Sequence, residues 1–397
     1  MKPLRLSHYT ATTCLGRGLA PLQMALAGMH SGLTPCAFET VRLDTWVGEV
    51  AGVDSVVLPE PLFDYNCRNN RLALLGLETD GFADVVRDVI AHYGKRRVGL
   101  FLGTSTAGIL ETELAYRQRD LVTGALPDAY NYRTSHNTYS VAAFTRAYFG
   151  LEGPAMVVST ACSSSAKVFA AAARMIACGL IDAAVVGGVD SLCLTTLYGF
   201  NSLELLSPQP CRPYDVERNG ISIGEGAAFA LLEPVDATTT NDDVLLLGSG
   251  ESSDAYHMSA PHPEGRGAHM AMSAALCSAG LAAADIDYIN LHGTATPSND
   301  AAEGRAVGDL FGARVPCSST KGATGHTLGA AGALETIIAA LALRNSLMPG
   351  SCNTRQLDPA LSLDYLLAPR RSELKHVLSN SFGFGGSNCS LILGRPS

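Results

Sequence analysis

The alternation of short apolar runs with longer helix-forming runs predicts an α/β fold in which helices are layered on sheets. Apolar runs such as Ala183–Val189 are typical of buried strands, and alanine-rich runs such as Ala330–Arg344 are typical of helices. In both halves of the chain an apolar strand ends in small polar residues and leads into a helix, which suggests a duplicated architecture.

In the first half, the residue pattern predicts elements in the following order. A strand over residues 4–13 (LRLSHYTATT) opens the chain, and a helix over Pro21–Met29 follows it. Pro59–Leu75 is a loop that enters a second helix, and Asp80–Tyr93 is a third helix. Arg97–Gly103 is a buried strand, and Glu111–Arg119 is a polar helix. No linker or low-complexity segment separates this half from the next.

The stretch Val157–Gly179 carries the strongest chemical signal. A short run, Ala155–Val158, predicts a buried strand, and Ala166–Ala177 predicts a helix that Gly179 ends. Cys162 therefore stands where a strand ends and a helix begins, and we expect the helix dipole and unpaired backbone N–H groups to favour its thiolate. The alternative is a buried structural cysteine, but the small serine and threonine side chains around Cys162 favour a turn open to substrate.

The second half repeats the alternation. The pattern predicts two strands, Phe229–Glu233 and Val244–Gly248, then a helix over Ala268–Ala279 and a strand over Tyr288–His292. A second helix follows over Ala330–Arg344. Two late strands, His376–Ser379 and Cys389–Leu393, lie on either side of a glycine-rich loop.

The composition favours a globular enzyme and argues against nucleic-acid-binding, membrane-spanning and disulfide-rich classes of protein. The 397 residues are 47% hydrophobic and 16% charged, as in a globular enzyme with a sizeable core, and the net charge of −9 argues against general nucleic-acid binding. The N-terminal residues lack the apolar segment of a signal peptide, and Arg174 and Asp182 interrupt the most apolar stretch, so we expect no membrane span. Eleven cysteines without CxxC spacing predict neither a disulfide framework nor a metal site, and a cytoplasmic location is expected.

Four further stretches place reactive side chains at turns. His292 follows the apolar run YINL, where a histidine suits acid–base work, and Lys321 and His326 share the turn KGATGH before a helix. The loop FGFGG lets backbone N–H groups approach a ligand. A phosphate-binding loop is the rival interpretation of the Lys321 turn, but the GxxxxGK[ST] pattern is absent. The stretch Cys211–Glu233 is interpreted as structural.

Together, TACSSS, HGTATP, KGATGHTLGAAGALE and NSFGFGGSN resemble the elongating β-ketoacyl-acyl carrier protein synthases, the condensing enzymes of fatty-acid and type II polyketide synthesis. The four motifs occur in the family's order with comparable spacing, from about Asp64 to the C-terminus. The resemblance implies a thiolase-like fold. Its two similar βαβαβ halves, residues 1–235 and 236–397, would pack as a five-layered α-β-α-β-α sandwich.

The resemblance also implies a catalytic triad of Cys162, His292 and His326. Cys162 would hold the acyl group, and the histidines would stabilise the enolate formed when malonyl-carrier protein loses carbon dioxide. The backbone N–H groups of Cys162 and Phe384 would form a second oxyanion hole. Lys321 would be a fixed positive charge near the histidines, and Glu335 would support it.

Further roles follow from the same resemblance. Thr294 and Thr296 match threonines that contact pantetheine, Phe384 matches a gating phenylalanine, Asp254 lies on the loop facing it, and Ile109 is a candidate for the acyl pocket. Substrates would arrive on the phosphopantetheine of an acidic carrier protein, with no separate cofactor. A basic patch would dock that carrier, and the candidates are Arg68, Arg71, Arg117 and Arg119, for which a merely solvated face is the alternative.

Several alternatives stay open. The histidine at position 326 favours an elongating synthase over initiating or plant-type enzymes, which carry asparagine there. Cys162 favours activity over a non-condensing chain-length-factor-like subunit, and no second catalytic cysteine supports a thiolase-type acyltransferase. The opening LSHYTATTCLGRG departs from the family's usual start and leaves both an aryl polyene or other type II polyketide pathway and fatty-acid elongation open. The expected dimer is therefore a homodimer or a heterodimer with a chain-length-factor-like subunit.

Overall fold

The computed structural model describes residues 1–396. The first half contains β1 (Leu4–Thr13), β2 (Gly16–Arg17), α1 (Leu19–Ala27), β3 (Thr34–Pro35), β4 (Trp46–Gly48), α2 (Arg68–Leu77), α3 (Phe82–Tyr93), β5 (Val98–Gly103), α4 (Ile109–Arg117), α5 (Ser140–Phe149), β6 (Ala155–Val158), α6 (Ser164–Ala177), β7 (Ala183–Asp190), α7 (Leu194–Ser202), β8 (Ile223–Gly224) and β9 (Gly226–Pro234).

The second half contains β10 (Val244–Ser253), α8 (Arg266–Ala279), β11 (Tyr288–Asn290), α9 (Pro297–Phe311), β12 (Pro316–Ser318), α10 (Lys321–Thr324), α11 (Ala331–Asn345), β13 (Leu347–Met348), β14 (Asp364–Tyr365), β15 (Arg370–Arg371), β16 (His376–Gly383) and β17 (Ser387–Gly394). Short 3₁₀ turns connect several of these elements.

A large mixed sheet carries the fold, and its strand order repeats. The first half runs β6–β5–β7–β9–β1 and the second β12–β11–β16–β17–β10, with the short strand β14 added beyond β12. When the five strands of each half are numbered in chain order, both halves have the same spatial order: third, second, fourth, fifth and first. The pairing directions also agree, since the first two pairs in each order are parallel and the last two antiparallel. β1 joins the halves by pairing with β10 over Leu4–Leu6.

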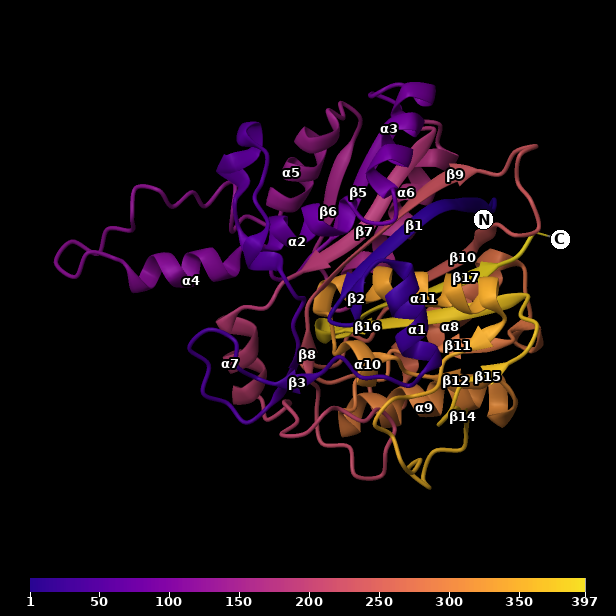
Figure 1. Ribbon diagram of the computed structural model, residues 1–397. Coiled ribbons are helices and arrows are strands. Elements are labelled where there is room, and N and C mark those ends of the chain that lie inside the picture. The colour runs from indigo at the N-terminus through magenta and orange to yellow at the C-terminus, as the bar shows by residue number, and fades with distance from the viewer. Residues whose placement is uncertain (397) are drawn as a thin grey trace.

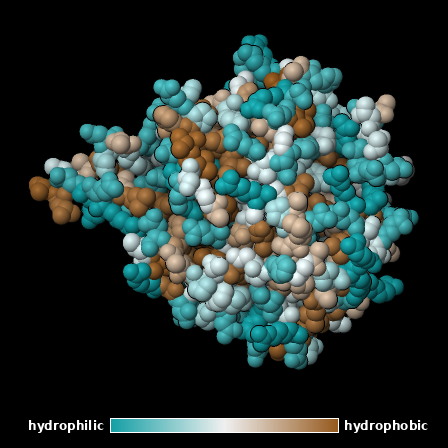
Figure 2. Space-filling model, viewed as in Figure 1, coloured by the Kyte–Doolittle hydropathy of each residue, from teal (hydrophilic) through white to brown (hydrophobic). Residues whose placement is uncertain are grey.

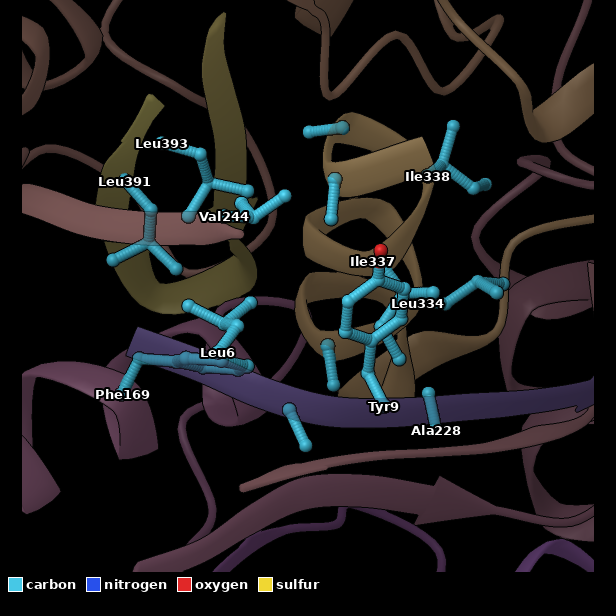
Figure 3. Close-up of a cluster of buried hydrophobic side chains, with 14 of the residues drawn as sticks. Leu6, Tyr9, Phe169, Ala228, Val244, Leu334, Ile337, Ile338, Leu391 and Leu393 are labelled. Carbon is cyan, nitrogen blue, oxygen red and sulfur yellow. The ribbon is translucent and has the colours of Figure 1, made fainter. Parts of the chain in front are cut away.

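The helices α6 and α11 occupy the middle of the molecule, and each follows the third strand of its half (Figure 1). One core cluster combines side chains of β1, α6, β9, β10, α11 and β17, including Leu6, Tyr9, Phe169 and Ile337 (Figure 3). The two helices approach closely because Gly332 of α11 has no side chain: a Cβ atom there would lie 2.4 Å from the Ala166 nitrogen. A second cluster packs α2, α3 and α5 on the other face of the first-half strands, and a third packs α8 and α9 on the second-half strands.

The burial of α11 accounts for its composition. Within residues 1–396, Leu328–Asn345 is the one stretch with the length and apolarity of a membrane-crossing helix, and 89% of it is buried inside the protein. It is therefore the central core helix of the fold.

A long projection departs from the body at α4 (Figure 1). The helix and the loop after it extend outward, and the end of the projection is strongly hydrophobic on its surface (Figure 2). Leu121 and Val122 in this loop are 88% and 94% exposed. Such apolar exposure on a protruding segment is typical of an interaction surface.

The structure confirms the predicted alternation and most of the predicted elements, and it corrects one. Ala155–Val158 forms β6 as expected, but β6 is the edge strand of its half, and Met156 is 42% exposed rather than buried. Four helices that the residue pattern did not predict, α5, α7, α9 and the short α10, complete the first and second halves.

Candidate active site

Cys162 lies in a tight turn between β6 and α6. Ala161, directly before it, adopts a left-handed conformation with φ of 52°, which turns the chain sharply at the end of the strand. The Ser164 hydroxyl accepts a hydrogen bond from the Thr160 N–H at 2.8 Å and donates to the Ala161 carbonyl at 2.5 Å. The serine-rich sequence thus satisfies the backbone groups of the turn and leaves the sulfur facing inward.

The electrostatic setting of Cys162 differs from the prediction. Burial raises the pKa of the Cys162 thiol to about 11, although Lys321 and the Phe384 N–H, which donates to the sulfur, both act to lower this pKa. The prediction of a thiolate favoured by the helix start was wrong for the free enzyme, because α6 begins only at Ser164 and removal of the sulfur from water outweighs the favourable groups.

His292 follows β11 and is held by a buried carboxylate. The backbone N–H groups of His292 and Gly293 each donate to Glu303 of α9 at 2.8 Å, and the Asn380 amide donates to the same carboxylate at 3.1 Å. Asp300, one turn earlier in α9, accepts hydrogen bonds from the N–H groups of Thr294 and Ala295. These two acids position the whole HGTAT segment, and sequence analysis missed both, although PSNDAAEG places them three residues apart after the motif.

His326 is held by backbone on both sides. Its N–H donates to the Ser222 carbonyl at 2.7 Å, and its own carbonyl accepts from Gly224 at 3.0 Å. The Leu328 N–H donates to Nδ1 of the ring at 3.2 Å, so the ring proton lies on Nε2, which is 3.1 Å from the Cys162 sulfur. His326 therefore presents a donor to the site.

Burial and the charge of Lys321 determine the protonation state of both imidazoles. Its buried ammonium forms an ion pair with Glu335, donates to the His292 carbonyl at 2.5 Å and lies 3.3 Å from Nδ1 of His292. Burial first, and then the Lys321 charge, hold the pKa of His292 and of His326 well below the usual value. Both rings are therefore neutral at pH 7, and His292, like His326, has its Nδ1 lone pair engaged and its Nε2–H free to donate.

The Cys–His–His group also has the composition of a metal site. The ligand atoms of Cys162, His292 and His326 lie within 4.8 Å of one another. A histidine ligand must offer a lone pair, however, and both Nε2 atoms carry the proton in this arrangement. The geometry fits two hydrogen-bond donors facing a sulfur nucleophile better than it fits a cation.

A narrow pocket, with a cavity volume of about 40 Å³, opens onto these groups. Seven of the predicted residues line it: Cys162, Asp254, His292, Thr294, Thr296, His326 and Phe384. Part of its apolar lining comes from Phe200 of α7, Leu205 and Ile221, which sequence analysis missed because the residues around them form no distinctive pattern. Ile109 does not line the pocket; it packs in an adjacent apolar cluster that includes Ile221.

Two loops close around the outer end of the pocket. The Asp254 carboxylate accepts hydrogen bonds from the Asn388 amide at 2.8 Å and the His262 N–H at 3.1 Å, and Gly385 donates to the Met258 carbonyl. The Phe384 ring lies 5.5 Å from that of Phe200. Thr294 and Thr296 are buried with their hydroxyls 2.9 Å apart, and Thr296 also caps α9.

The predicted docking arginines separate into two kinds. Arg68 is buried and forms ion pairs with Glu225, Asp54 and Glu49, so its prediction as a surface docking residue was wrong. Glu225 is fully buried and lies far away in the sequence, which is why the pairing has no local signal. Arg71 is half-buried against Asp54, whereas Arg117 and Arg119 of the α4 region are exposed.

Comparison with known proteins gives the following similarities. Residues 85–237 match the family model "Beta-ketoacyl synthase, N-terminal domain" and residues 244–355 the model "Beta-ketoacyl synthase, C-terminal domain". A 3-oxoacyl-[acyl-carrier-protein] synthase 2 of Rhizobium meliloti (strain 1021) is 43% identical over 262 residues, covering 62% of each chain. Nodulation protein E of Rhizobium meliloti is 36% identical over 74% of this chain and 75% of its own.

Solved structures extend the similarity over the whole chain. The ketosynthase ApeO in complex with its chain length factor ApeC from Xenorhabdus doucetiae superposes with a TM-score of 0.90 at 38% identity, covering 100% of this chain and 98% of that one. A β-ketoacyl synthase from Burkholderia phymatum STM815 gives a TM-score of 0.88 at 28% identity over both full chains. The sequence matches to the curated 3-oxoacyl synthases span a little under two thirds of their length, 62% and 63% for the Rhizobium and Coxiella burnetii enzymes.

Proposed function

Since the chain belongs to the β-ketoacyl synthase family, we propose that it is a 3-oxoacyl-acyl carrier protein synthase that extends an acyl chain by two carbons. The observation that carries this proposal is the buried group of one sulfur and two Nε2–H donors at the end of a pocket. A decarboxylative condensation needs such a nucleophile and such donors together.

In the first half-reaction, the Cys162 sulfur attacks the thioester carbonyl of an acyl-carrier protein. The tetrahedral oxyanion is stabilised by the backbone N–H groups of Cys162 and Phe384, and the pantetheine sulfur leaves. The proton from the Cys162 thiol ends on that departing sulfur, so no net proton is consumed. The enzyme is then acylated on Cys162.

In the second half-reaction, malonyl-carrier protein binds with its thioester carbonyl between His292 and His326. Loss of carbon dioxide leaves an enolate, whose oxygen accepts both Nε2–H bonds. Its carbon forms the new C–C bond to the acyl carbonyl as the C–S bond to Cys162 breaks, and the released Cys162 thiolate regains a proton from solvent. Each donor of this kind is worth about 3 kcal/mol of barrier. Burial, and then the Lys321 charge, keep the imidazoles neutral, so that they stabilise the enolate as donors and do not protonate it.

The pantetheine arm would run past Thr294 and Thr296, whose buried hydroxyls line the pocket. Phe384 would act as the gate, because its ring lines the pocket from the loop that Asn388 ties to Asp254 and lies 5.5 Å from the Phe200 ring. Phe200, Leu205 and Ile221 provide the apolar surface on which the acyl chain would lie.

A thiolase-like division of the chain belongs to the same proposal. Residues 1–235 and 236–397 would form two βαβαβ halves, stacked as α-β-α-β-α layers. The repeated strand order and directions support it, as do α6 and α11 lying together between the two sets of strands.

The dimer would form along the edge strand β6, whose outer side has no partner among residues 1–396. The α4 projection, with its exposed apolar end, would lie against the second subunit (Figure 2). That subunit is a second copy or a chain-length-factor-like protein; the complex of ApeO with ApeC supports the latter and an aryl polyene or related polyketide pathway. The carrier protein would dock at Arg117 and Arg119, in the cytoplasm.

The proposal is tested with purified acyl- and malonyl-carrier proteins. Wild-type enzyme should release carbon dioxide, gain the acyl mass and give a product two carbons longer, whereas Cys162→Ala should gain no acyl mass. His292→Asn and His326→Asn should acylate but lose decarboxylation. An unmodified wild-type mass would instead indicate a non-condensing subunit, and cleavage of 3-ketoacyl-coenzyme A with free coenzyme A would indicate a thiolase-type enzyme.

A further inference from the structure

Asp190 is a buried carboxylate that the chemistry above does not use. It is the last residue of β7, has no exposed surface, and accepts hydrogen bonds from two separate parts of the chain. On one side the donors are Thr104, Ser105 and Thr106, through both backbone and hydroxyl groups at 2.5–3.0 Å. On the other side the Gly329 N–H donates to Oδ2 at 2.5 Å.

The contact with Gly329 leads directly to His326. The backbone of His326 is fixed by Ser222 and Gly224, and the chain then turns through Leu328, which has a left-handed φ of 50°. Such a conformation in a branched residue persists only where neighbouring contacts hold it. The Leu328 N–H donates to Nδ1 of His326, and the next residue, Gly329, is the one that Asp190 holds.

We propose that Asp190 is a positioning residue for the decarboxylation step: its carboxylate anchors the 327–329 turn so that the Leu328 N–H keeps the His326 proton on Nε2. The inference rests on the proposed role of His326. The first half-reaction uses the Cys162 sulfur and backbone N–H groups that Asp190 does not contact, so loss of the anchor should affect the two half-reactions unequally.

A carboxylate is the group that this place requires. Every partner of Asp190 donates, and three of these donors are backbone N–H groups that cannot reverse direction. An asparagine has one acceptor oxygen and would turn its NH₂ group toward at least one N–H. The backbone N–H groups of Ser105 and Thr106 both donate to Oδ1, so the asparagine oxygen would take that place. The asparagine NH₂ group would then stand where Oδ2 is now, and the hydrogen bond from the Gly329 N–H would be lost.

The test compares Asp190→Asn with wild type in two separate assays. Decarboxylation of malonyl-carrier protein should fall by about ten- to hundredfold, by analogy with the partners that orient metal-binding histidines. Acylation of Cys162, followed by intact mass, should stay within about threefold. Equal losses in both assays, or an unchanged decarboxylation rate, would overturn the inference.

Additional variants keep the test decisive. Gly329→Ala disrupts the same contact from the other residue, since its Cβ would lie 2.8 Å from both Asp190 Oδ2 and the Ser105 nitrogen. It should also lower decarboxylation more than acylation, and this result does not depend on whether Asp190→Asn folds. Asp215→Asn is the matched control, a buried carboxylate that accepts backbone N–H groups elsewhere, and should leave the ratio of the two rates unchanged. His326→Asn separates the two hypotheses: normal decarboxylation in that variant would refute the role of His326 itself.

Discussion

The nucleophilic role proposed for Cys162 falls on a buried sulfur, and burial dominates the pKa of this thiol in the free enzyme. With the pKa of its thiol near 11, only about one molecule in 10⁴ carries the thiolate at pH 7. The hydrogen bond from the Phe384 N–H is then stronger for the thiolate than for the thiol. Cys162 is therefore reactive through this donor and the nearby Lys321 charge rather than through a permanently charged resting state.

The first prediction concerns this raised pKa. The rate at which iodoacetamide alkylates Cys162 should rise about tenfold for each pH unit between pH 7 and 9, because the thiolate fraction rises by that factor below the pKa. Site-specific mass spectrometry measures the rate, with Cys162→Ala as the blank. A plateau below pH 8 would show that the pKa is depressed and that the helix start outweighs burial.

The second prediction concerns the ion pair of Lys321 and Glu335. Glu335→Leu leaves the Lys321 ammonium buried without its counter-ion and should lower the free energy of unfolding by about 3–5 kcal/mol, measured in urea. The double variant Lys321→Met with Glu335→Leu should recover most of this stability and yet decarboxylate poorly. A double variant with normal decarboxylation would reduce Lys321 to a structural role.

At the scale of elements, the sequence predicted the strands and helices with strong patterns and missed the others. β7, α6 and α11 have long apolar or alanine-rich runs, which identify them. α7 and α9 contain Gly, Ser, Thr and Asn, residues with weak helix propensity, and tertiary packing stabilises them instead. The exposure of β6 depends on its position at the sheet edge, which no local pattern encodes.

Among site residues, the motifs located the sulfur, the imidazoles and the lysine, because each stands in a distinctive turn. The residues that hold them could not be located in the same way. Glu303 and Asp190 act through contacts that only the folded chain creates, and the partner of Arg68 is distant in sequence. Long-range pairing, rather than residue type, decides those roles.

The third prediction follows from the corrected role of Arg68, which joins α2 to the start of β9. Arg68→Met leaves Glu225 buried without a cation and should lower the free energy of unfolding by about 3–5 kcal/mol, with an unchanged KM for carrier protein. Arg119→Glu is the matched contrast and should raise that KM at unchanged stability. A higher KM for Arg68→Met at full stability would restore it as a docking residue.

At the scale of the whole molecule, the two halves make contacts within the chain, whereas the edge strand β6 and the α4 projection have surfaces free for contacts with another subunit. The two halves bury their helices against each other, which leaves the edge strand β6 and the α4 projection as the unpaired parts of the first half. Both are apolar at their outer surfaces, as Met156, Leu121 and Val122 show.

The fourth prediction tests this surface. Introducing charge with Leu121→Asp and Met156→Asp should abolish dimer formation, whether with a second copy or with a co-expressed chain-length-factor-like subunit, because each carboxylate would be desolvated in the interface. Sedimentation velocity measures the state. Met270→Asp, at an exposed methionine of helix α8, should leave the dimer intact. Dimers in all three variants would place the interface elsewhere.

The position of β17 between β10 and β16 also has a consequence for synthesis on the ribosome. The first-half strands can all pair once β9 has emerged, but β10 keeps one edge open until residues 387–394 are made. At about 5–20 residues per second, that edge waits on the order of ten seconds. Nascent chains therefore carry an open, apolar strand edge through most of the second half of translation, which makes this interval the period of greatest risk for aggregation and the one in which a chaperone would be of most use.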